Sequence, residues 1–420
     1  MKLHANPANL LLDGNMSKLR RRLTVLARIG SQLSATLRVA DVYHNHAKSA
    51  LCLVLVLLSF GCSTPVLDQA RETYYNNEPH AGIEALNEAS VPERDKILFL
   101  MERGSLHQLE ADYPRSISDL NDANALLRQM DTLSVTRGAG SLVANDNVLN
   151  FYGYPFERTY LHVINALNYL VVNDWQGAGV EGRRIIKTLK AENIKEFPED
   201  AFSRYLAGLC MELVDDPANA RVEYRKASKI SKTLDVSDSG LLLPEGQIDI
   251  ENPETQPPAP PKDQAYLICI ILTGRIADYS KSIPDNESNP PVITISSNGE
   301  TLGDAVAIVD MGTLAFDSEA QRAVLHAAKT AARIAGKIAI ADSVSDHSGL
   351  LGALVYMTLM ALEQPDVRHW ETLPRHISLA RLPCPADLKT IELTIGTKEI
   401  TIKRPIQKQG HLFITFERIL

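Results

Sequence analysis

Hydrophobic residues recur at helical spacing through the first half of the chain, from about residue 67 to residue 235, and the breaks fall at Asn, Asp, Gly and Pro. Positions three and four residues apart lie on one face of an α-helix, so this pattern predicts a series of amphipathic helices. Three of the segments also share a small residue, a turn at Asp and an aromatic side chain near that turn. Small side chains let paired helices approach each other, and each pair can bury its open face on the next pair. We therefore predict a repetitive helical domain over residues 67–235.

These three segments resemble the tetratricopeptide repeat, in which two helices form one unit of a stacked array. Their matched small residues are Gly104, Ala166 and Gly208, and the uneven spacing indicates an insertion between the first and second clear repeats. The resemblance implies an α-solenoid, and the residues after Leu67 fit a degenerate first repeat.

The pattern changes at residue 236. Prolines crowd residues 236–264, and such a density prevents helix formation, so we predict a semi-rigid linker there. Beyond the linker, β-branched and alternating runs predict strands within a smaller α+β domain over residues 265–420. The expected strands are residues 265–274 and 291–297, then HISLARL, TIELTI, KEITIKR and HLFITFERI, with Gly396-Thr397 as a hairpin turn.

Two helices are expected to pack on this antiparallel sheet. The first spans residues 317–341 and opens at Asp317-Ser318. The second spans residues 349–363 and is apolar all round. Because a transmembrane helix needs roughly 20 apolar residues, we predict a buried core helix there, with partner binding as the alternative.

A short apolar run ahead of the helical half, LCLVLVLLSFGCSTP, occupies residues 51–65. It is too short to span a bilayer, and its length matches the hydrophobic region of a signal peptide. Small residues stand directly before Cys62, although Ser59 takes the place where Leu is usual. The run resembles the lipobox of bacterial lipoproteins, in which a signal peptidase cuts before the cysteine and the thiol then carries a diacylglycerol.

The lipobox resemblance implies a leader and signal peptide over residues 1–61, lipidation of Cys62 and a tether over residues 62–66. The stretch ahead of the apolar run is long for a signal peptide, so we expect translation to start downstream of Met1. Ser63 follows the cysteine, which implies sorting to the bacterial outer membrane, with the protein facing the periplasm.

Two further blocks resemble a widespread, functionally uncharacterised family of bacterial tetratricopeptide lipoproteins. The first block covers residues 134–170 together with Val180-Glu181-x-Arg183-Arg184, and the second is PDVRHWETLP, residues 365–374. The similarity spans nearly all of the mature chain. It implies the repeat fold and the lipid anchor but no reaction.

Both blocks contain candidate partner-binding residues. The first block holds a cluster of aromatic side chains. A cluster of this kind usually packs onto the helices of its own chain, and contact with a partner is the alternative. The aromatic candidates, in a loop with Gly and Pro, are Phe151, Tyr152, Tyr154 and Phe156. The second patch is Asp366, Arg368 and Trp370, for which the alternative is a corner that pins a helix to the sheet. Glu181 and Arg184 predict a surface ion pair.

Candidate chemistry is sparse. The formal net charge of −8 disfavours nucleic acid as a partner. The cysteines and histidines lack metal-binding spacings, so we predict neither a metal site nor a cofactor. The run Ser345-Asp346-His347-Ser348 holds triad residue types, but neighbours in sequence rarely aim at one another, and the run suits a helix cap. We therefore predict that the protein is not an enzyme.

Three function classes remain. The sequence favours a protein-binding scaffold at the outer membrane, whose partners are other envelope proteins and whose contact with the membrane is its lipid anchor. The second class is a periplasmic lipoprotein that binds a small ligand or a glycan. The third is a hydrolase with a hidden site, which a buried His or carboxylate pair in a closed pocket would indicate.

Overall fold

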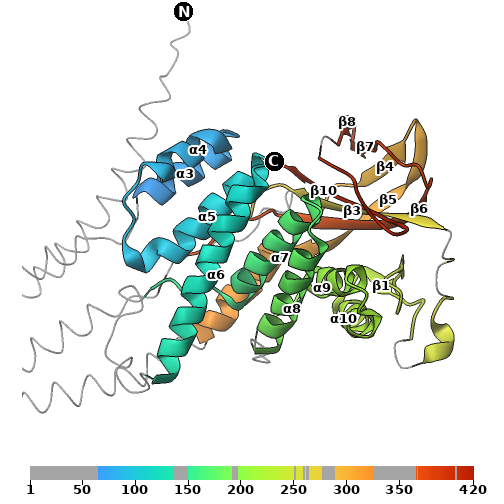
Figure 1. The fold of residues 1–420 in the computed structure, drawn as a ribbon, viewed down its shortest axis with the longest axis horizontal. Helices are drawn as coiled ribbons and strands as arrows, with labels where there is room; N and C mark the ends of the chain where they lie inside the picture. Colours follow the sequence, from blue (N-terminus) through green and yellow to red (C-terminus); the bar gives the residue numbers. More distant parts are fainter. Residues whose placement is uncertain are drawn as a thin grey trace, which may run out of the picture. The chain divides into compact units, whose positions relative to one another are not determined.

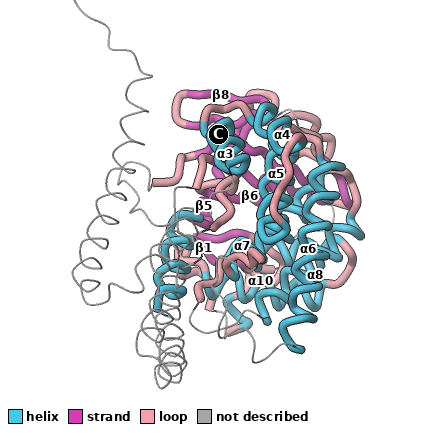
Figure 2. Tube along the Cα trace, turned by 90° about the vertical axis from the view of Figure 1, so that its left-hand side faces the viewer, coloured by secondary structure: helices cyan, strands magenta, loops and turns pink. Residues whose placement is uncertain are grey.

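The structure is a computed structural model that describes residues 65–136, 150–191, 197–249, 252–258, 261, 264–276, 289–324, 366, 368–402 and 404–420. Residues 62–420 form one compact unit, in which helices gather beside strands (Figures 1 and 2). Several sequence predictions fall outside the described residues, namely the leader, Cys62, most of the tether, the run 345–348 and the helix 349–363.

The first half of this unit consists of consecutive helices, as the hydrophobic pattern predicts. Each helix packs against the next one along the chain, and α3, α5, α7 and α9 also pack in series. The bounds are α3 (Pro65–Tyr75), α4 (Pro79–Asn87), α5 (Lys96–Leu109), α6 (Tyr113–Thr136), α7 (Pro155–Val171), α8 (Trp175–Ala191), α9 (Ala201–Leu213) and α10 (Pro217–Ile230). Among the described residues, no helix is long and apolar enough to cross a bilayer.

The four helix pairs between α3 and α10 turn in the same way. Each turn holds one residue in the left-handed conformation, and these residues are Asn77 (φ 62°), Ala111 (φ 59°), Asn173 (φ 62°) and Asp215 (φ 60°). Ala rarely adopts this conformation, so the shared turn geometry, rather than the residue type, sets the backbone at Ala111. Within the last pair, a Cβ added at Gly208 would lie 2.8 Å from the Tyr224 ring. The matched small residue therefore lies where two helices cross.

Two of these helices begin at an Asp in opposite surroundings. Asp200 precedes α9, is buried, and accepts the Ser203 N–H at 2.7 Å. Burial raises the pKa of its carboxyl. Asp216 precedes α10 at the surface, and hydrogen bonds from Asn219 lower the pKa of its carboxyl. A raised pKa in the folded state means that the contribution of Asp200 to stability falls as pH rises through that pKa. The contribution of Asp216 is present above its unfolded pKa and is lost as pH falls.

We therefore expect opposite pH profiles for Asp200→Asn and Asp216→Asn, because Asn also caps helices well. Between about pH 4 and about pH 7, Asp200→Asn should gain free energy of unfolding relative to the unchanged protein as pH rises. Asp216→Asn should instead lose it as pH rises toward about pH 4, the range below the unfolded pKa of Asp, and should run level with the unchanged protein above that. Chemical denaturation at several pH values measures both, and parallel profiles would contradict the assignment.

The second half contains a sheet with the strand order β8-β7-β4-β5-β6-β3-β10-β9. Its strands are β3 (Ala265–Thr273), β4 (Ile293–Ser297), β5 (Glu300–Asp310), β6 (His376–Cys384), β7 (Glu392–Ile395), β8 (Lys398–Thr401), β9 (Gln407–Gln409) and β10 (Leu412–Ile419). Neighbours pair antiparallel as predicted, except that β10 pairs parallel with β3. The hairpin turn at Gly396 is confirmed by its φ of 60°. The hydrophobic pattern did not predict β5 and β9.

The two faces of the sheet enter different cores. Ile268 and Ile270 of β3 join the cluster that contains helix residues such as Tyr160 and Tyr224. Leu267 and the other alternate residues of β3 join a smaller cluster on the opposite face. Because one hydrophobic core runs from the helices into the sheet, the predicted boundary at 236–264 marks a change of element type within one compact unit.

The segment predicted as a linker is partly structured. A hairpin of β1 (Leu234–Val236) and β2 (Leu242–Pro244) packs on α10, and a short 3-10 helix spans Pro253–Thr255. Leu234 and Val236 are buried. The prediction of an unpacked linker is therefore wrong for its first part, because apolar residues ahead of its first proline, Pro244, bury surface against α10.

A helix follows β5 directly and runs from residue 311 to 324, where the description stops. It starts six residues before the predicted Asp317, because the Asp310 carboxylate accepts the Gly312 and Thr313 N–H groups at 2.9 and 3.1 Å. The predicted continuation to residue 341 lies outside the described residues.

Candidate functional site

The inner surface of the helices, where α5 and α7 face the C-terminal half, is covered by residues 368–375. Their backbone is held by two buried carboxylates. Glu157 on α7 accepts the Trp370 N–H at 2.5 Å, and Glu102 on α5 accepts the N–H groups of Glu371 and Thr372, both at 3.1 Å. Glu102 and Glu157 are at most 1% exposed. The helices therefore hold an irregular stretch of their own chain.

The predicted patch of Asp366, Arg368 and Trp370 lies within this contact. Arg368 pairs with Asp366 at 2.8 Å and with Asp95, just before α5, at 2.7 Å. Trp370 is fully buried and donates its indole N–H to Thr372. As a partner-binding patch the prediction is wrong, because the contacts of Arg368 and Trp370 are made inside the chain. The alternative of a pinning corner describes the geometry better, with helices rather than a strand as the anchored element.

The aromatic candidates divide in the same way. Phe151, Tyr154 and Phe156 are at most 4% exposed, and the rings of Tyr154 and Phe156 stack at 5.9 Å. Tyr152 is 39% exposed, and its hydroxyl donates to Asp131. Partner contact is therefore a wrong prediction for the three buried rings and stays a prediction for Tyr152. Residues 137–149 of the preceding loop lie outside the described residues.

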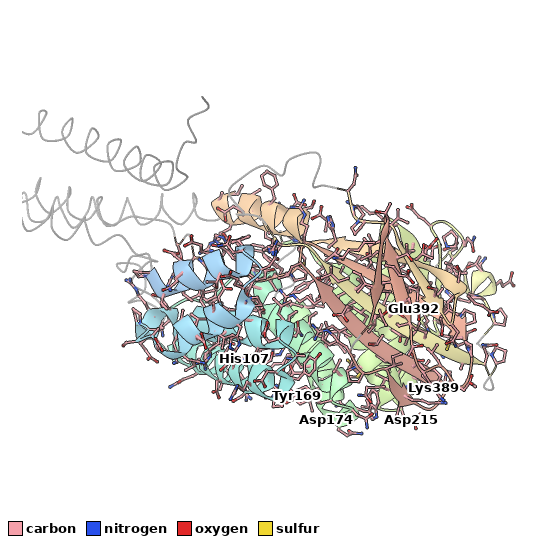
Figure 3. All side chains as sticks on the ribbon, turned by 90° about the horizontal axis from the view of Figure 1, so that it is seen from above. His107, Tyr169, Asp174, Asp215, Lys389 and Glu392 are labelled. Atoms are coloured by element: carbon pink, nitrogen blue, oxygen red, sulfur yellow. The ribbon has the colours of Figure 1, made fainter. Side chains whose placement is uncertain are left out.

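An open cleft lies between α6 and α8, with a volume of about 330 Å³. Each wall is one helical stripe at positions i, i+3, i+4 and i+7. The α6 stripe is Asn121, Asn124, Ala125 and Arg128, and the α8 stripe is Gly177, Val180, Glu181 and Arg184. Tyr169 and Asp174 complete the lining, and Figure 3 labels them close together on the helical part.

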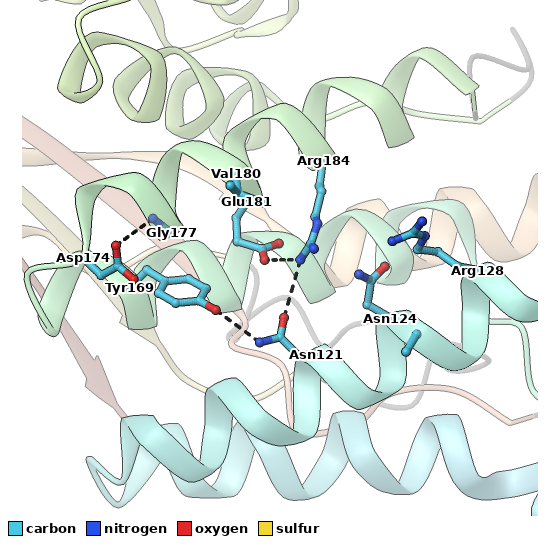
Figure 4. A pocket seen from close by; sticks show the side chains of 10 residues that line it. Asn121, Asn124, Arg128, Tyr169, Asp174, Gly177, Val180, Glu181 and Arg184 are labelled. Atoms are coloured by element: carbon cyan, nitrogen blue, oxygen red, sulfur yellow. Dashed lines mark hydrogen bonds and ion pairs between the residues drawn. The ribbon is translucent and has the colours of Figure 1, made fainter.

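A buried carboxylate organises this cleft. Glu181, 1% exposed, accepts Arg184 Nη1 at 2.5 Å and Asn165 Nδ2 at 3.1 Å, and its other oxygen lies 2.7 Å from His162 Nδ1 (Figure 4 shows the pair with Arg184). The sequence predicts the Glu181–Arg184 pair correctly but places it on the surface. Arg184 is the exposed end of this pair, with 32% of its side chain accessible.

The Asn121 amide closes the network across the cleft. Its Nδ2 donates to the Tyr169 hydroxyl at 3.2 Å, and its Oδ1 accepts from Asn165 and Arg184. Asp174 accepts the Gly177 N–H at 2.8 Å and thereby caps α8. Both oxygens of Glu181 are thus engaged by groups of the protein, whereas Asp174 is exposed and engages one oxygen, so the arginine end of the arrangement can offer donors to a ligand.

Metal and thiol chemistry find no support in the part of the chain that the structure describes. That part holds no group of three His, Cys, Asp or Glu side chains arranged for a metal ion. Cys210, Cys269 and Cys384 are buried free thiols. Burial raises the pKa of Cys384 to about 11 and that of the other two further still, so thiolates are scarce at neutral pH.

Comparison with known proteins identifies no relative by sequence, since no family model and no curated protein matches the chain. Among solved structures, the chain is similar to a MamA double mutant designated RS-1 ArsTM and to MamA from residue 41 to its end from Desulfovibrio magneticus RS-1. Each is 13% identical with a TM-score of 0.27, over 39% of this chain and 72% or 73% of the other. Similarity at this level assigns no function.

Proposed function

We propose that this chain is a lipid-anchored scaffold of the bacterial outer membrane, facing the periplasm, that binds other envelope proteins in envelope assembly or maintenance. The observation that carries the proposal is the open α6–α8 cleft on an array of stacked helix pairs. Repeated helix pairs of tetratricopeptide type present extended surfaces that suit protein partners. The lipobox at Cys62 supports the membrane anchor.

The cleft is a better partner surface than the inner face of the helices. The inner face already holds residues 368–375, through the Glu102 and Glu157 carboxylates. A partner there would have to displace a fully buried Trp370, whereas the α6–α8 cleft is open. Among the residues that the structure describes, none of those that line the cleft is a Ser, Cys or His.

A small polar ligand is the second candidate function. The cleft volume of about 330 Å³ falls at the lower end of small-molecule sites, and its lining is rich in amide and guanidinium groups. A protein partner would extend its contact beyond the cleft, whereas a small ligand would not. Crosslinking from the rim of the cleft separates the two.

The anchor is tested at Cys62. We expect the N-terminal peptide of the membrane-extracted protein to begin at this cysteine and to carry acyl chains, because stable anchoring requires two or more of them. In Cys62→Ser the protein should move from the outer-membrane fraction to the soluble fraction. Mass spectrometry and fractionation measure the two outcomes. An intact peptide that crosses Gly61-Cys62 would refute the anchor.

Partner binding is tested with a photo-crosslinking amino acid at Val180 on α8. Val180 is 43% exposed and lines the cleft, while Val222 on α10 is 47% exposed and serves as the matched control away from it. A scaffold should give discrete protein adducts in cells from position 180 and not from position 222. Adducts that are equal at both positions, or absent at 180, would count against a protein partner in the cleft.

A further inference from the structure

The two stripes of the cleft run in the same order, so the ends of the cleft differ in chemistry. Figure 4 places Arg128 and Arg184 toward one end, and Asp174 with Tyr169 toward the other. Ala125 and Gly177 are the small residues of the two walls. The cleft is open, with a volume of about 330 Å³, so a polar chain can lie along it with its anionic group at the arginine end.

Arg184 is a prepared receptor for an anion. Its Nη1 is fixed by Glu181, which is itself held by Asn165 and His162. Within the described residues, Nε and Nη2 of Arg184 make no hydrogen bond, and 32% of the side chain is accessible. A guanidinium that is already oriented loses little entropy when its remaining donors bind a carboxylate, and such charge-assisted bonds are strong.

The remaining groups specify the kind of anion. The lining carries Arg128 and Arg184 against Asp174 and Glu181, so its formal charges balance, and a single carboxylate suits it better than a doubly charged phosphate. The Tyr169 hydroxyl already accepts the Asn121 amide at 3.2 Å. Asn124 has no hydrogen-bond partner among the described residues and can pair with a peptide amide, while Val180 offers apolar contact.

We propose that the α6–α8 cleft binds a carboxylate of a peptide segment, with Arg184 as the group that receives it and Asn124 as a contact for the backbone. The carboxylate belongs either to a chain end or to an Asp or Glu side chain, since both present the same two oxygens. This inference rests on the proposed scaffold function and names the chemistry that the partner brings to the cleft.

The probe is a set of four synthetic peptides titrated calorimetrically into the full-length protein in detergent. The parent is acetyl-Gly-Ala-Val-Ala-Asp-Ala with a free C-terminus, and the others replace Asp by Asn, the C-terminus by an amide, or both. We expect the parent to bind and the doubly neutral peptide to bind at least tenfold more weakly, since hydrogen bonds to a charged group are the stronger ones. The two singly neutral peptides identify whether the Asp side chain or the C-terminal carboxylate is bound.

Variants assign the binding to the cleft. Arg184→Gln should weaken the parent peptide at least tenfold, whereas Arg183→Gln, an exposed neighbour outside the cleft, should leave it unchanged. Because Arg184→Gln also removes a partner of buried Glu181, Val180→Asp gives an independent test at an exposed position. It should weaken the parent peptide about fivefold to tenfold relative to Val180→Asn.

Equal binding of the charged and doubly neutral peptides, or equal binding by Val180→Asp and Val180→Asn, would overturn the carboxylate inference. If crosslinks from position 180 persist in that case, the scaffold function stands and the recognition chemistry is wrong. If peptide binding depends on charge but position 180 gives no protein adducts, the scaffold function is rejected and the cleft remains a carboxylate-binding site. Absence of both would reject both.

Discussion

Replacing Trp370 by Ala is expected to lower the free energy of unfolding by about 3–5 kcal/mol, the usual cost of removing a fully buried Trp side chain. Trp370 has no exposed surface, and its indole N–H donates to the Thr372 hydroxyl at 3.0 Å. It also sits between the two halves of the unit, since its backbone N–H is held by Glu157 of α7. The cavity would open at this junction, so helices and sheet should lose stability together.

Urea unfolding followed by circular dichroism and by tryptophan fluorescence measures this effect, and in the Trp370 variants the fluorescence reports Trp175 alone. We expect the two transitions to coincide in the unchanged protein, because residues 62–420 form one compact unit, and to shift together in Trp370→Ala. Trp370→Phe is the matched control and should cost less, since it keeps most of the buried ring. Two separate transitions, with the variant moving one of them, would show that the halves fold independently and would restore the division predicted from the sequence.

The repetitive helices could be predicted because their signals are local. Apolar spacing, a small residue at the crossing and a turn residue are all read within one helix pair, and the structure repeats the same turn at Asn77, Ala111, Asn173 and Asp215. The parallel pairing of β10 with β3 joins strands from opposite ends of the second half, and no local pattern encodes it. β5 was missed because Gly303 and Asp304 interrupt its alternation.

The candidate site was harder to predict from the sequence than the fold was. A stripe such as Asn121, Asn124 and Arg128 looks like any solvated helix face, and it becomes a wall because α8 stands opposite. The i, i+3, i+4, i+7 repeat of amides and a guanidinium was the one available signal. In the same way, PDVRHWETLP is distinctive in sequence, but its role depends on Glu102 and Glu157, which lie more than 200 positions away.

The second large effect is expected at a buried ion pair between α9 and β6. Arg381 Nη2 and Nη1 donate to the two Glu212 carboxylate oxygens at 2.8 and 2.9 Å, and the Tyr224 hydroxyl donates to the same carboxylate. The Arg381 side chain is 1% exposed, whereas that of Glu212 is 23% exposed. Because of this difference in burial, removing the Glu212 carboxylate and removing the Arg381 guanidinium should lower the free energy of unfolding by different amounts.

Glu212→Gln should cost about 3–5 kcal/mol of unfolding free energy, because it leaves the Arg381 charge buried without its counter-ion. Arg381→Met should cost less, about 1–2 kcal/mol, because water can reach the remaining carboxylate and the methionine fills apolar space. In the Arg381→Met background, Glu212→Gln should then cost little, so the double-mutant cycle should show strong coupling. The exposed pair Arg225–Asp238 is the control, and Asp238→Asn should cost at most about 1 kcal/mol. Equal costs for Glu212→Gln and Arg381→Met would mean that Arg381 reaches water and that the contact of α9 with the sheet is looser than its geometry indicates.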